Sequence, residues 1–479
     1  MLVCGPQTMW QPTAAVGTRR LRPANLSTGR DLTRKSTTTS YGYPLFAYGR
    51  FARKQGSAIN VLYHERDVIK PGWTKVVRPN NDTMYSSIFC DLSQSDLVIS
   101  VPEIGDRFWS FSFFDMYGNN YSSVMGLMGH KPGDYRLTFA EDDFGLHEDS
   151  SDGDERGVIH SPTPYGIWTV RLLLKNQTDD VQHVHALQNQ IKVVTKPRVH
   201  DSGVPPFDLS IFSEVAGSEQ SPVSEAEQVL RLTAALSRYN QSEVLQDRSW
   251  IAYVLEKAGI RDGVFTQPPN TSLAVAVDLA NLSAKALKLT AGIVRDQGHG
   301  WYTNTPMICG NFRSFYAARY LVAMRGYLGV ASDQAIYPSY RPPGSAAEIP
   351  DIKIGPKQAI KLSFSRKPLL HPLGFWSLSL YDKDQLFIPN ALEHYALGDR
   401  NDLKCLDGTP LKEQADGKFE ILIQPSDVVP PEEWHSNWLP APPGGGEVSF
   451  TFRVFGASCS MIDGSYEYPK VIFSDALTA

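Results

Sequence analysis

The sequence lacks the features that mark several large classes of protein. Its 479 residues include only five cysteines, with no Cys-x-x-Cys pair, so the chain is not a disulfide-stabilised scaffold. No apolar run reaches the roughly 18 residues that a membrane-spanning helix needs. The formal charge of −5 gives no basic excess, which argues against a nucleic-acid partner. We therefore expect a soluble protein with no transmembrane segment.

Signatures of known catalytic, cofactor and metal sites are also missing. The chain has no G-x-S-x-G elbow, no P-loop, no G-x-G-x-x-G after a strand and no HExxH. His183 and His185 are two apart in a helix-like stretch, where their side chains diverge. The sequence thus predicts neither a metal site nor a cofactor. It does not show whether histidines that are distant in the chain meet.

Residues 1–40 predict a flexible tail and do not settle localisation. They are basic and lack the apolar stretch of about 7 to 15 residues found in a secretory signal, which favours a cytoplasmic protein. Asn-x-Ser/Thr triplets would carry glycans only in a secreted chain, an alternative that stays open if the true start lies elsewhere. These triplets begin at Asn25, Asn81, Asn120, Asn176, Asn240, Asn270 and Asn281.

The periodicity of apolar residues changes twice along the chain. Residues 107–117 alternate with period two, which places Trp109, Phe111 and Phe113 on one face of a strand. Residues 448–455 alternate in the same way. The pattern predicts an α+β fold of two β-sandwich or jelly-roll-like domains with a helical region between them. The expected parts are a tail at 1–40, a β-rich domain at 41–200, a helical region at 201–335, a linker at 336–358 and a β-sandwich domain at 359–479.

Two segments of the first β-rich region recur in the second. Residues 108–115 (FWSFSFFD) match residues 375–382 (FWSLSLYD) at five of eight positions. Further along, residues 168–171 (WTVR) resemble residues 450–453 (FTFR). Two matches in the same order suggest a duplicated β unit on either side of the helical region. Duplication would place Trp109 on Trp376 and Arg171 on Arg453.

Residues 78–85 (RPNNDTMY) form the densest polar segment. As the rim of a cleft, it would use Arg78 and Asn80 to bind an anionic or carbonyl oxygen, Asp82 as an acid or base and Tyr85 as a donor. The alternative is a Pro-led turn that hydrogen-bonds to its own backbone, with Asp82 held ionised by Arg78. Both interpretations stay open.

Further candidates for ligand contact are aromatic or polar residues at strand ends and in one loop. Tyr117 ends the clearest strand, where loop residues often bind ligands, although turn chemistry explains it equally well. Trp438 either walls a pocket for an apolar or ring-shaped ligand or fills the core. The remaining candidates for substrate binding are Trp376, Tyr381, Asn437 and Arg453.

The same segments resemble a pair of known domains. Residues 77–86 resemble the N-terminal signature of the domain of unknown function numbered twelve fifty-four. Residues 374–382 and 437–442 resemble its usual partner, domain twelve fourteen. The resemblance covers nearly everything after residue 40 and implies two β-rich, partly jelly-roll domains with a helical segment. The lead-in at residues 342–345 (PPGS) departs from the family pattern, which puts one edge of any pocket in doubt.

The resemblance also guides the expected function, because some relatives belong to metabolite pathways. We expect a tailoring enzyme of a small-molecule (secondary-metabolite) pathway that performs cofactor-independent acid/base chemistry on a largely apolar substrate. The reaction would be of hydrolase, lyase, isomerase or cyclase type. Asp82 and Tyr85 would exchange protons, Arg78 or Arg453 would stabilise an oxyanion, and tryptophans 376 and 438 would shape the cavity.

The alternative function is a non-catalytic β-sandwich binding or envelope protein for a carbohydrate, lipid or protein partner. An Asp/Tyr/Arg cluster that converges in a closed pocket would favour the enzyme. The same residues, if saturated by backbone hydrogen bonds, would favour the binding protein. A homo-oligomer is compatible with either function, since exposed sheet edges need covering.

Overall fold

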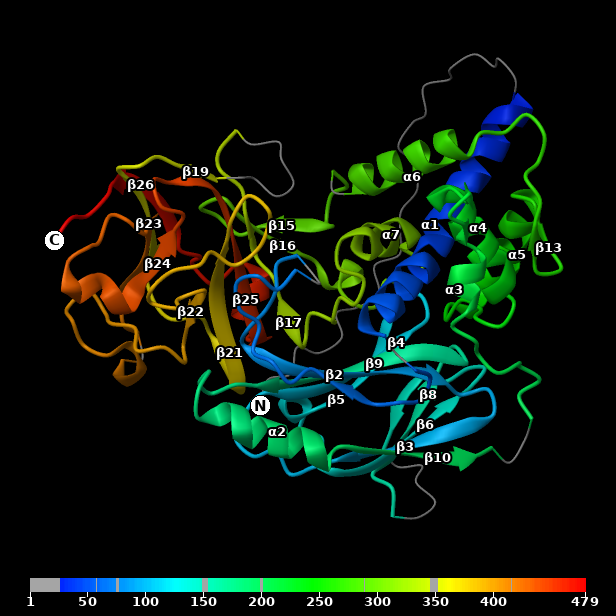
Figure 1. Cartoon of the computed structure of the whole chain (residues 1–479), viewed down its shortest axis with the longest axis horizontal. Helices are drawn as coiled ribbons and strands as arrows, with labels where there is room; N and C mark the ends of the chain where they lie inside the picture. Colours follow the sequence, from blue (N-terminus) through cyan, green and yellow to red (C-terminus); the bar gives the residue numbers. More distant parts are fainter. Residues whose placement is uncertain are drawn as a thin grey trace.

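Two β units and a layer of helices make up the fold (Figure 1). The structure is a computed structural model that describes residues 26–56, 58–74, 77–148, 154–198, 201–287, 289–344, 352–414 and 416–479. Helices and largely antiparallel sheets alternate along the chain, so the predicted α+β class is confirmed. Among the described residues, no helix is long and apolar enough to cross a lipid bilayer.

The first β unit contains two five-stranded sheets, in the orders β1-β2-β9-β4-β5 and β10-β3-β6-β8-β7. One hydrophobic cluster includes Trp109, Phe111 and Phe113 of β4 together with Leu97 and Ile99 of β3, so the two sheets share a core. Helix α2 (Asp180–Gln190) packs against it. The strands are β1 (Tyr63–His64), β2 (Thr83–Asp91), β3 (Ser95–Val101), β4 (Trp109–Asp115), β5 (Asn120–Met125), β6 (Gly133–Phe139), β7 (Gly145–His147), β8 (Gly157–Ser161), β9 (Tyr165–Leu173) and β10 (Lys192–Pro197).

The second β unit repeats this arrangement with fewer strands. Its sheets have the orders β17-β25-β21-β22, with β19 also paired to β25, and β24-β23-β20-β26. Trp376, Leu378 and Phe452 belong to the core that both sheets share. The strands are β17 (Ala335–Ile336), β19 (Ile352–Ile354), β20 (Gln358–Phe364), β21 (Leu370–Tyr381), β22 (Ala396–Gly398), β23 (Phe419–Pro425), β24 (Trp438–Ala441), β25 (Gly446–Ala457) and β26 (Lys470–Asp475).

The two units have the same strand topology. Strands β2, β9, β4 and β5 correspond in order to β19, β25, β21 and β22, and strands β10, β3, β6 and β8 correspond to β26, β20, β23 and β24. In the first unit β6 pairs with β8 in parallel, and in the second unit β23 pairs with β24 in parallel. The registers agree as well, because Ser110 lies opposite Arg171 and Ser377 lies opposite Arg453. The repeated sequence segments therefore occupy equivalent positions in two copies of one strand pattern.

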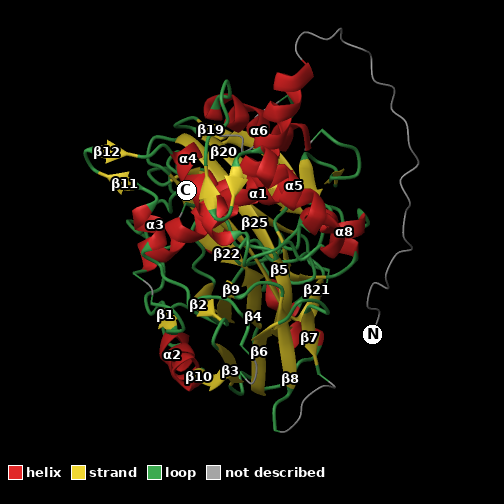
Figure 2. Ribbon diagram, turned by 90° about the vertical axis from the view of Figure 1, so that its right-hand side faces the viewer, coloured by secondary structure: helices red, strands yellow, loops and turns green. Residues whose placement is uncertain are grey.

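Helix α1 (Leu26–Gln55) is the centre of the helical layer, so part of the expected tail is helical. It packs against the other long helices of the layer (Figures 1 and 2). Between Ser36 and Gly49 nearly every residue is buried, and a helix covered on all sides shows no amphipathic period. The other members are α4 (Glu225–Leu236), α5 (Arg248–Lys257), α6 (Leu273–Leu287) and α7 (Tyr316–Arg325).

Short elements connect these layers. Part of the expected linker forms strands β18 and β19, which are too short to leave a periodic pattern in the sequence. The short strands are β11 (Gly217–Ser218), β12 (Ser221–Pro222), β13 (Ile260–Arg261), β14 (Val264–Phe265), β15 (Val294–Asp296), β16 (Trp301–Asn304) and β18 (Ser339–Tyr340). The short helices are α3 (Ile211–Glu214), α8 (Ser460–Asp463), η1 (Gly126–Met128), η2 (Leu245–Asp247), η3 (Pro306–Ile308), η4 (Leu411–Glu413) and η5 (Glu432–Asn437).

Candidate functional site

A cavity of about 930 Å³ is lined by β2 and β9 of the first unit, β25 of the second, helices α1 and α7, and the loops at residues 63–74, 77–80 and 337–341. The helices contribute mainly apolar side chains, such as Phe51, Leu321 and Met324. This volume suits a small organic ligand. All three layers of the fold are therefore needed to form the cavity.

Strand alternation explains which side chains face this cavity. In β9, Trp168, Val170 and Leu172 point into the core of the first unit. Thr169 and Arg171 therefore point to the other face of the sheet, where they line the cavity. The equivalent strand β25 likewise presents a threonine and an arginine to the cavity, as the alternation in residues 448–455 predicted.

Four of the predicted site residues line this cavity: Arg78, Asn80, Tyr85 and Arg453. Arg78 has a left-handed backbone conformation, with φ of 51°. Its Nε donates a hydrogen bond to Gln385 Oε1 at 2.8 Å. The Nδ2 of Asn80 donates to the Tyr85 hydroxyl at 3.0 Å. The polar segment is thus a cavity rim that also docks on the second unit.

Arg453 and Tyr381 hold this rim in place. Arg453 Nη1 donates to Ser379 Oγ at 2.7 Å, and Nη2 donates to the Tyr381 hydroxyl at 2.6 Å and to the carbonyl oxygen of Arg78 at 3.0 Å. The Tyr381 hydroxyl in turn donates to the carbonyl oxygen of Pro79 at 2.7 Å. Both side chains are buried. Protein groups therefore engage most of the donors of Arg453, which makes it a positioning residue.

Asp82 lies outside the cavity lining, in the junction between the two β units. Its carboxylate forms an ion pair with Arg400 and accepts a hydrogen bond from Ser377 Oγ at 2.5 Å. Its carbonyl oxygen accepts from the backbone N–H of Leu174 at 2.9 Å. The side chain is only 1% exposed. The geometry therefore favours the structural interpretation of Asp82 over the acid/base role, and the expected partner Arg78 is replaced by Arg400.

Both predicted cavity tryptophans lie in hydrophobic cores instead. Trp376 packs against Phe364 and Phe419 inside the second unit, because it belongs to the inward face of β21. Trp438 packs with Leu422 in a small separate cluster. Neither lines the large cavity. The predicted role of these rings in shaping the cavity is therefore not supported.

Asn437 and Tyr117 make structural hydrogen bonds. Asn437 Oδ1 accepts from the backbone N–H of Lys404 at 2.9 Å, and its Nδ2 donates to the carbonyl oxygen of Glu420 at 2.7 Å. The Tyr117 hydroxyl donates to the carbonyl oxygen of Asn240 at 2.6 Å. Neither residue lines the large cavity, so both serve to join neighbouring loops.

Sequence reasoning missed Arg171, Thr169 and Tyr337 as cavity residues. Tyr337 is 42% exposed by surface area, yet desolvation of its hydroxyl raises its pKa, while Arg171 and Arg453 act against the rise. Tyr337 therefore carries its proton at neutral pH. Arg171 and Arg453 occupy equivalent positions in the repeated segments, and this was the one signal in the sequence that could have placed Arg171 at the site.

Positive charge predominates in the lining of this cavity. Among the described residues of the lining, Glu65 is the only acid. The lining cations are Lys54, Arg78, Arg171, Arg325, Arg341 and Arg453. Charges between apolar walls act more strongly than they do in water. The cavity thus combines apolar walls with an excess of positive charge.

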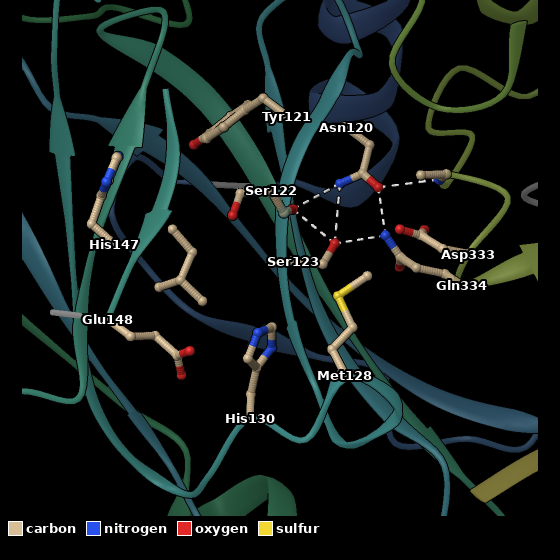
Figure 3. Close-up of a pocket in the computed structure, with 12 residues that line it drawn as sticks. Asn120, Tyr121, Ser122, Ser123, Met128, His130, His147, Glu148, Asp333 and Gln334 are labelled. Carbon is tan, nitrogen blue, oxygen red and sulfur yellow. Dashed lines mark hydrogen bonds between the residues drawn. The ribbon is translucent and has the colours of Figure 1, made fainter. Parts of the chain in front are cut away.

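A second pocket, of about 700 Å³, lies at the edge of the first unit (Figure 3). On one side Gln334 Nε2 donates to Asn120 Oδ1 and to Ser123 Oγ, both at 2.6 Å. His130 and Glu148 line the other side. No predicted catalytic or substrate-binding residue lines this pocket.

Two distant histidines do meet, beside this second pocket. Asp143, His147 and His160 each place a potential ligand atom within 4.8 Å of the others. The rings of both histidines are hydrogen-bonded to the carbonyl oxygen of Asp143, at 2.8 and 3.0 Å. Strands β7 and β8 carry the two histidines, and their pairing brings the rings together.

A buried pair of acids predicts a fall in stability with rising pH. Burial, and secondly the charge of Asp115, raise the pKa of Glu243 to about 7, against the influence of Arg319. Because this pKa lies above its unfolded value, the stabilisation is full below about pH 4.5 and is lost as the pH rises through about 7. Glu243→Gln is therefore expected to reduce the decline in melting temperature between pH 5 and 8, measured by differential scanning fluorimetry.

The control for this experiment is Glu256→Gln, which changes the same charge at an exposed position. It should leave the pH profile of the wild type unchanged. A Glu243→Gln profile as steep as that of the wild type would contradict the assignment.

Comparison with known proteins places both β units in described sequence families. Residues 59–195 match "Protein of unknown function (DUF1254)", and residues 351–458 match "Protein of unknown function (DUF1214)". No curated protein matches the chain. The VPA0106 protein from Vibrio parahaemolyticus has a similar crystal structure, with a TM-score of 0.59 and 16% identity, over 92% of this chain and 99% of that chain. The two therefore share a fold.

A second solved structure shows weaker similarity. It is an uncharacterized protein from Burkholderia cenocepacia, with a TM-score of 0.43 and 10% identity, over 94% of this chain and 95% of that chain.

Proposed function

This chain belongs to the proteins that pair a DUF1254 domain with a DUF1214 domain, and we propose that it binds and converts a small, largely apolar molecule in the cavity between them. The observation that carries this proposal is the cavity of about 930 Å³, in which apolar walls surround a group of arginine and tyrosine side chains. The conversion is a tailoring step of small-molecule metabolism, of hydrolase, lyase, isomerase or cyclase type.

The available proton donors are two tyrosines. Tyr85 accepts a hydrogen bond from Asn80, and within the described part of the chain its own proton has no acceptor, so a ligand oxygen can take it. Tyr337 keeps its proton because burial raises its pKa. Both can donate to an oxyanion that develops during reaction, with the guanidinium of Arg171 supplying positive charge. Proton transfer of this kind suits an isomerase, lyase or cyclase step.

A non-catalytic binding protein is the second candidate function. The observation that favours it is the position of Asp82, whose carboxylate is occupied by Arg400 and Ser377 outside the cavity. Without this carboxylate the lining offers few groups that could accept a proton. Binding would still use the same cavity and the same arginines.

Metabolite profiling of a deletion strain separates the two candidates. An enzyme is expected to leave an accumulated precursor and a missing product, both reversed by the wild-type gene. A binding protein would leave both metabolites present, while a small molecule would be released from the purified wild-type chain on denaturation. An unchanged metabolite profile together with an empty purified protein would contradict the proposal.

Tyr337→Phe is expected to reduce the restored product by about 100-fold, because a positioned proton donor contributes that order of rate. The measurement is product formation, by mass spectrometry, in the deletion strain that carries the variant gene. Tyr253→Phe is the matched control, since Tyr253 lies on α5 outside the cavity lining and should restore the product fully. Full restoration by Tyr337→Phe would remove Tyr337 from the chemistry.

A further inference from the structure

In the second β unit, polar side chains on the cavity-facing side of β21 and β25 have partners in the segment from Arg78 to Asp82. Ser377 Oγ donates to the carboxylate of Asp82, and Thr451 Oγ1 accepts from Arg78 Nη1 at 2.6 Å. Arg453 donates to the carbonyl oxygen of Arg78 at 3.0 Å. This segment therefore provides hydrogen-bond partners for the serine, the threonine and the arginine.

The equivalent side chains of the first unit are Ser110, Thr169 and Arg171, and none of them has such a partner. Within the described residues, Ser110 Oγ, Thr169 Oγ1 and Arg171 Nη1 are buried without a hydrogen bond. The Arg171 guanidinium lies over the ring of Tyr85, whose centroid is 5.7 Å away. The same local pattern is thus complete in one unit and incomplete in the other.

Neighbouring positions show why Arg171 stays unpaired. The hydroxyl of Tyr381, which binds Arg453, has no counterpart, because Phe114 occupies the equivalent position of β4. The equivalent of Ser379 is Ser112, whose hydroxyl donates to Gln334 instead. The first unit has therefore lost the oxygens that its arginine would need.

A charged guanidinium in this state is costly to the fold. Arg171 is only 9% exposed, and burying a charge without a partner is strongly unfavourable. Side chains of this kind persist where a ligand completes the pairing. Both Arg171 and Thr169 line the cavity, two residues apart on one face of β9. Both side chains therefore border the space that a ligand would fill.

We propose that Arg171 and Thr169 bind an anionic group, of the carboxylate type, on the molecule that occupies the cavity. This inference rests on the proposed function and names the charged part of its ligand. A neutral oxygen would satisfy hydrogen bonds but leave the charge uncompensated, and Glu65 is the only acid that the described part of the chain contributes to the lining. A planar carboxylate can accept two parallel hydrogen bonds from one guanidinium. The apolar remainder of the ligand would lie against α1 and α7.

Isothermal titration calorimetry of the full chain with dodecanoate and with dodecan-1-ol tests this inference. The wild type is expected to bind dodecanoate at least about tenfold more tightly, as a hydrogen bond to a charged group implies. Arg171→Met should abolish this preference and leave the affinity for dodecan-1-ol unchanged. Arg261→Met removes an equal charge from an exposed position and should keep the preference.

The outcomes separate the two proposals. Binding of neither compound to the wild type would overturn the proposed function. Equal binding of both compounds, or a preference that Arg171→Met retains, would overturn the anion site and leave the cavity for apolar ligands intact.

A measurement on the wild type serves if Arg171→Met does not fold. The carboxyl carbon of bound, 13C-labelled dodecanoate can be titrated by NMR. The pKa of the bound carboxyl group should fall below its value in water if a guanidinium pairs with it. It should rise if the carboxyl group lies between apolar walls alone. A raised pKa would overturn the inference.

Discussion

Asp82→Asn is expected to destabilise the folded chain by about 3 to 5 kcal/mol, the usual cost of removing one partner of a buried ion pair. Arg400 would keep only its longer contact with Asp399, at 3.9 Å, and only 17% of its side chain is exposed to water. Arg400 also donates to the carbonyl oxygen of Leu174, so the pair joins the second unit to the first. The measurement is the urea midpoint followed by tryptophan fluorescence.

The matched control is Asp402→Asn, which removes an equivalent charge from an exposed pair with Lys412 and should not move the midpoint. The double variant Asp82→Asn/Arg400→Met should recover part of the loss, because the charge of Arg400 is removed together with that of Asp82. A folded Asp82→Asn variant with an unchanged midpoint and no product in the complemented strain would instead restore the acid/base role of Asp82.

Trp376→Ala is expected to cost a similar 3 to 5 kcal/mol, since it leaves a large void in a well-packed core. The ring is 1% exposed and touches Phe364, Phe419 and Phe452. The same urea titration measures the effect. Because Trp376 does not line the cavity, the preference between dodecanoate and dodecan-1-ol should persist in whatever fraction of the variant folds.

Trp250→Ala serves as the comparison, because Trp250 is 47% exposed and its loss should shift the midpoint much less. If Trp376→Ala kept the wild-type midpoint and lost ligand affinity, the ring would be a cavity wall, as the sequence first suggested.

The density of polar residues in the sequence identified the right segment for the site, but not the role of each residue in that segment. Residues 78–85 do form a cavity rim, with Arg78, Asn80 and Tyr85 in the lining. Asp82, two positions from Asn80, turns into the junction between the β units. The difference arises from contacts with Ser377 and Arg400, about 300 residues further along the chain. A motif read in isolation contains no information about such partners.

The core was easier to predict than the boundaries. Alternation in β4 and β25 predicted which side chains point inward, because burial on one face of a strand follows a period of two. Helix α1 was missed over residues 26–40, and its part from Ser36 onward shows no amphipathic period because it is covered on several sides. The short strands β18 and β19 were missed because two or three residues show no period.

By itself, the sequence determined the α+β class, the inward faces of the main strands and the repeat that relates Arg171 to Arg453. Only the tertiary structure decided what these two arginines do. Both follow a threonine and an apolar residue, so their local geometry is alike. The segment around Arg78 accepts hydrogen bonds from Arg453, whereas no described residue does so for Nη1 of Arg171. Strand alternation is a local property, whereas the group that covers a strand face comes from elsewhere in the chain.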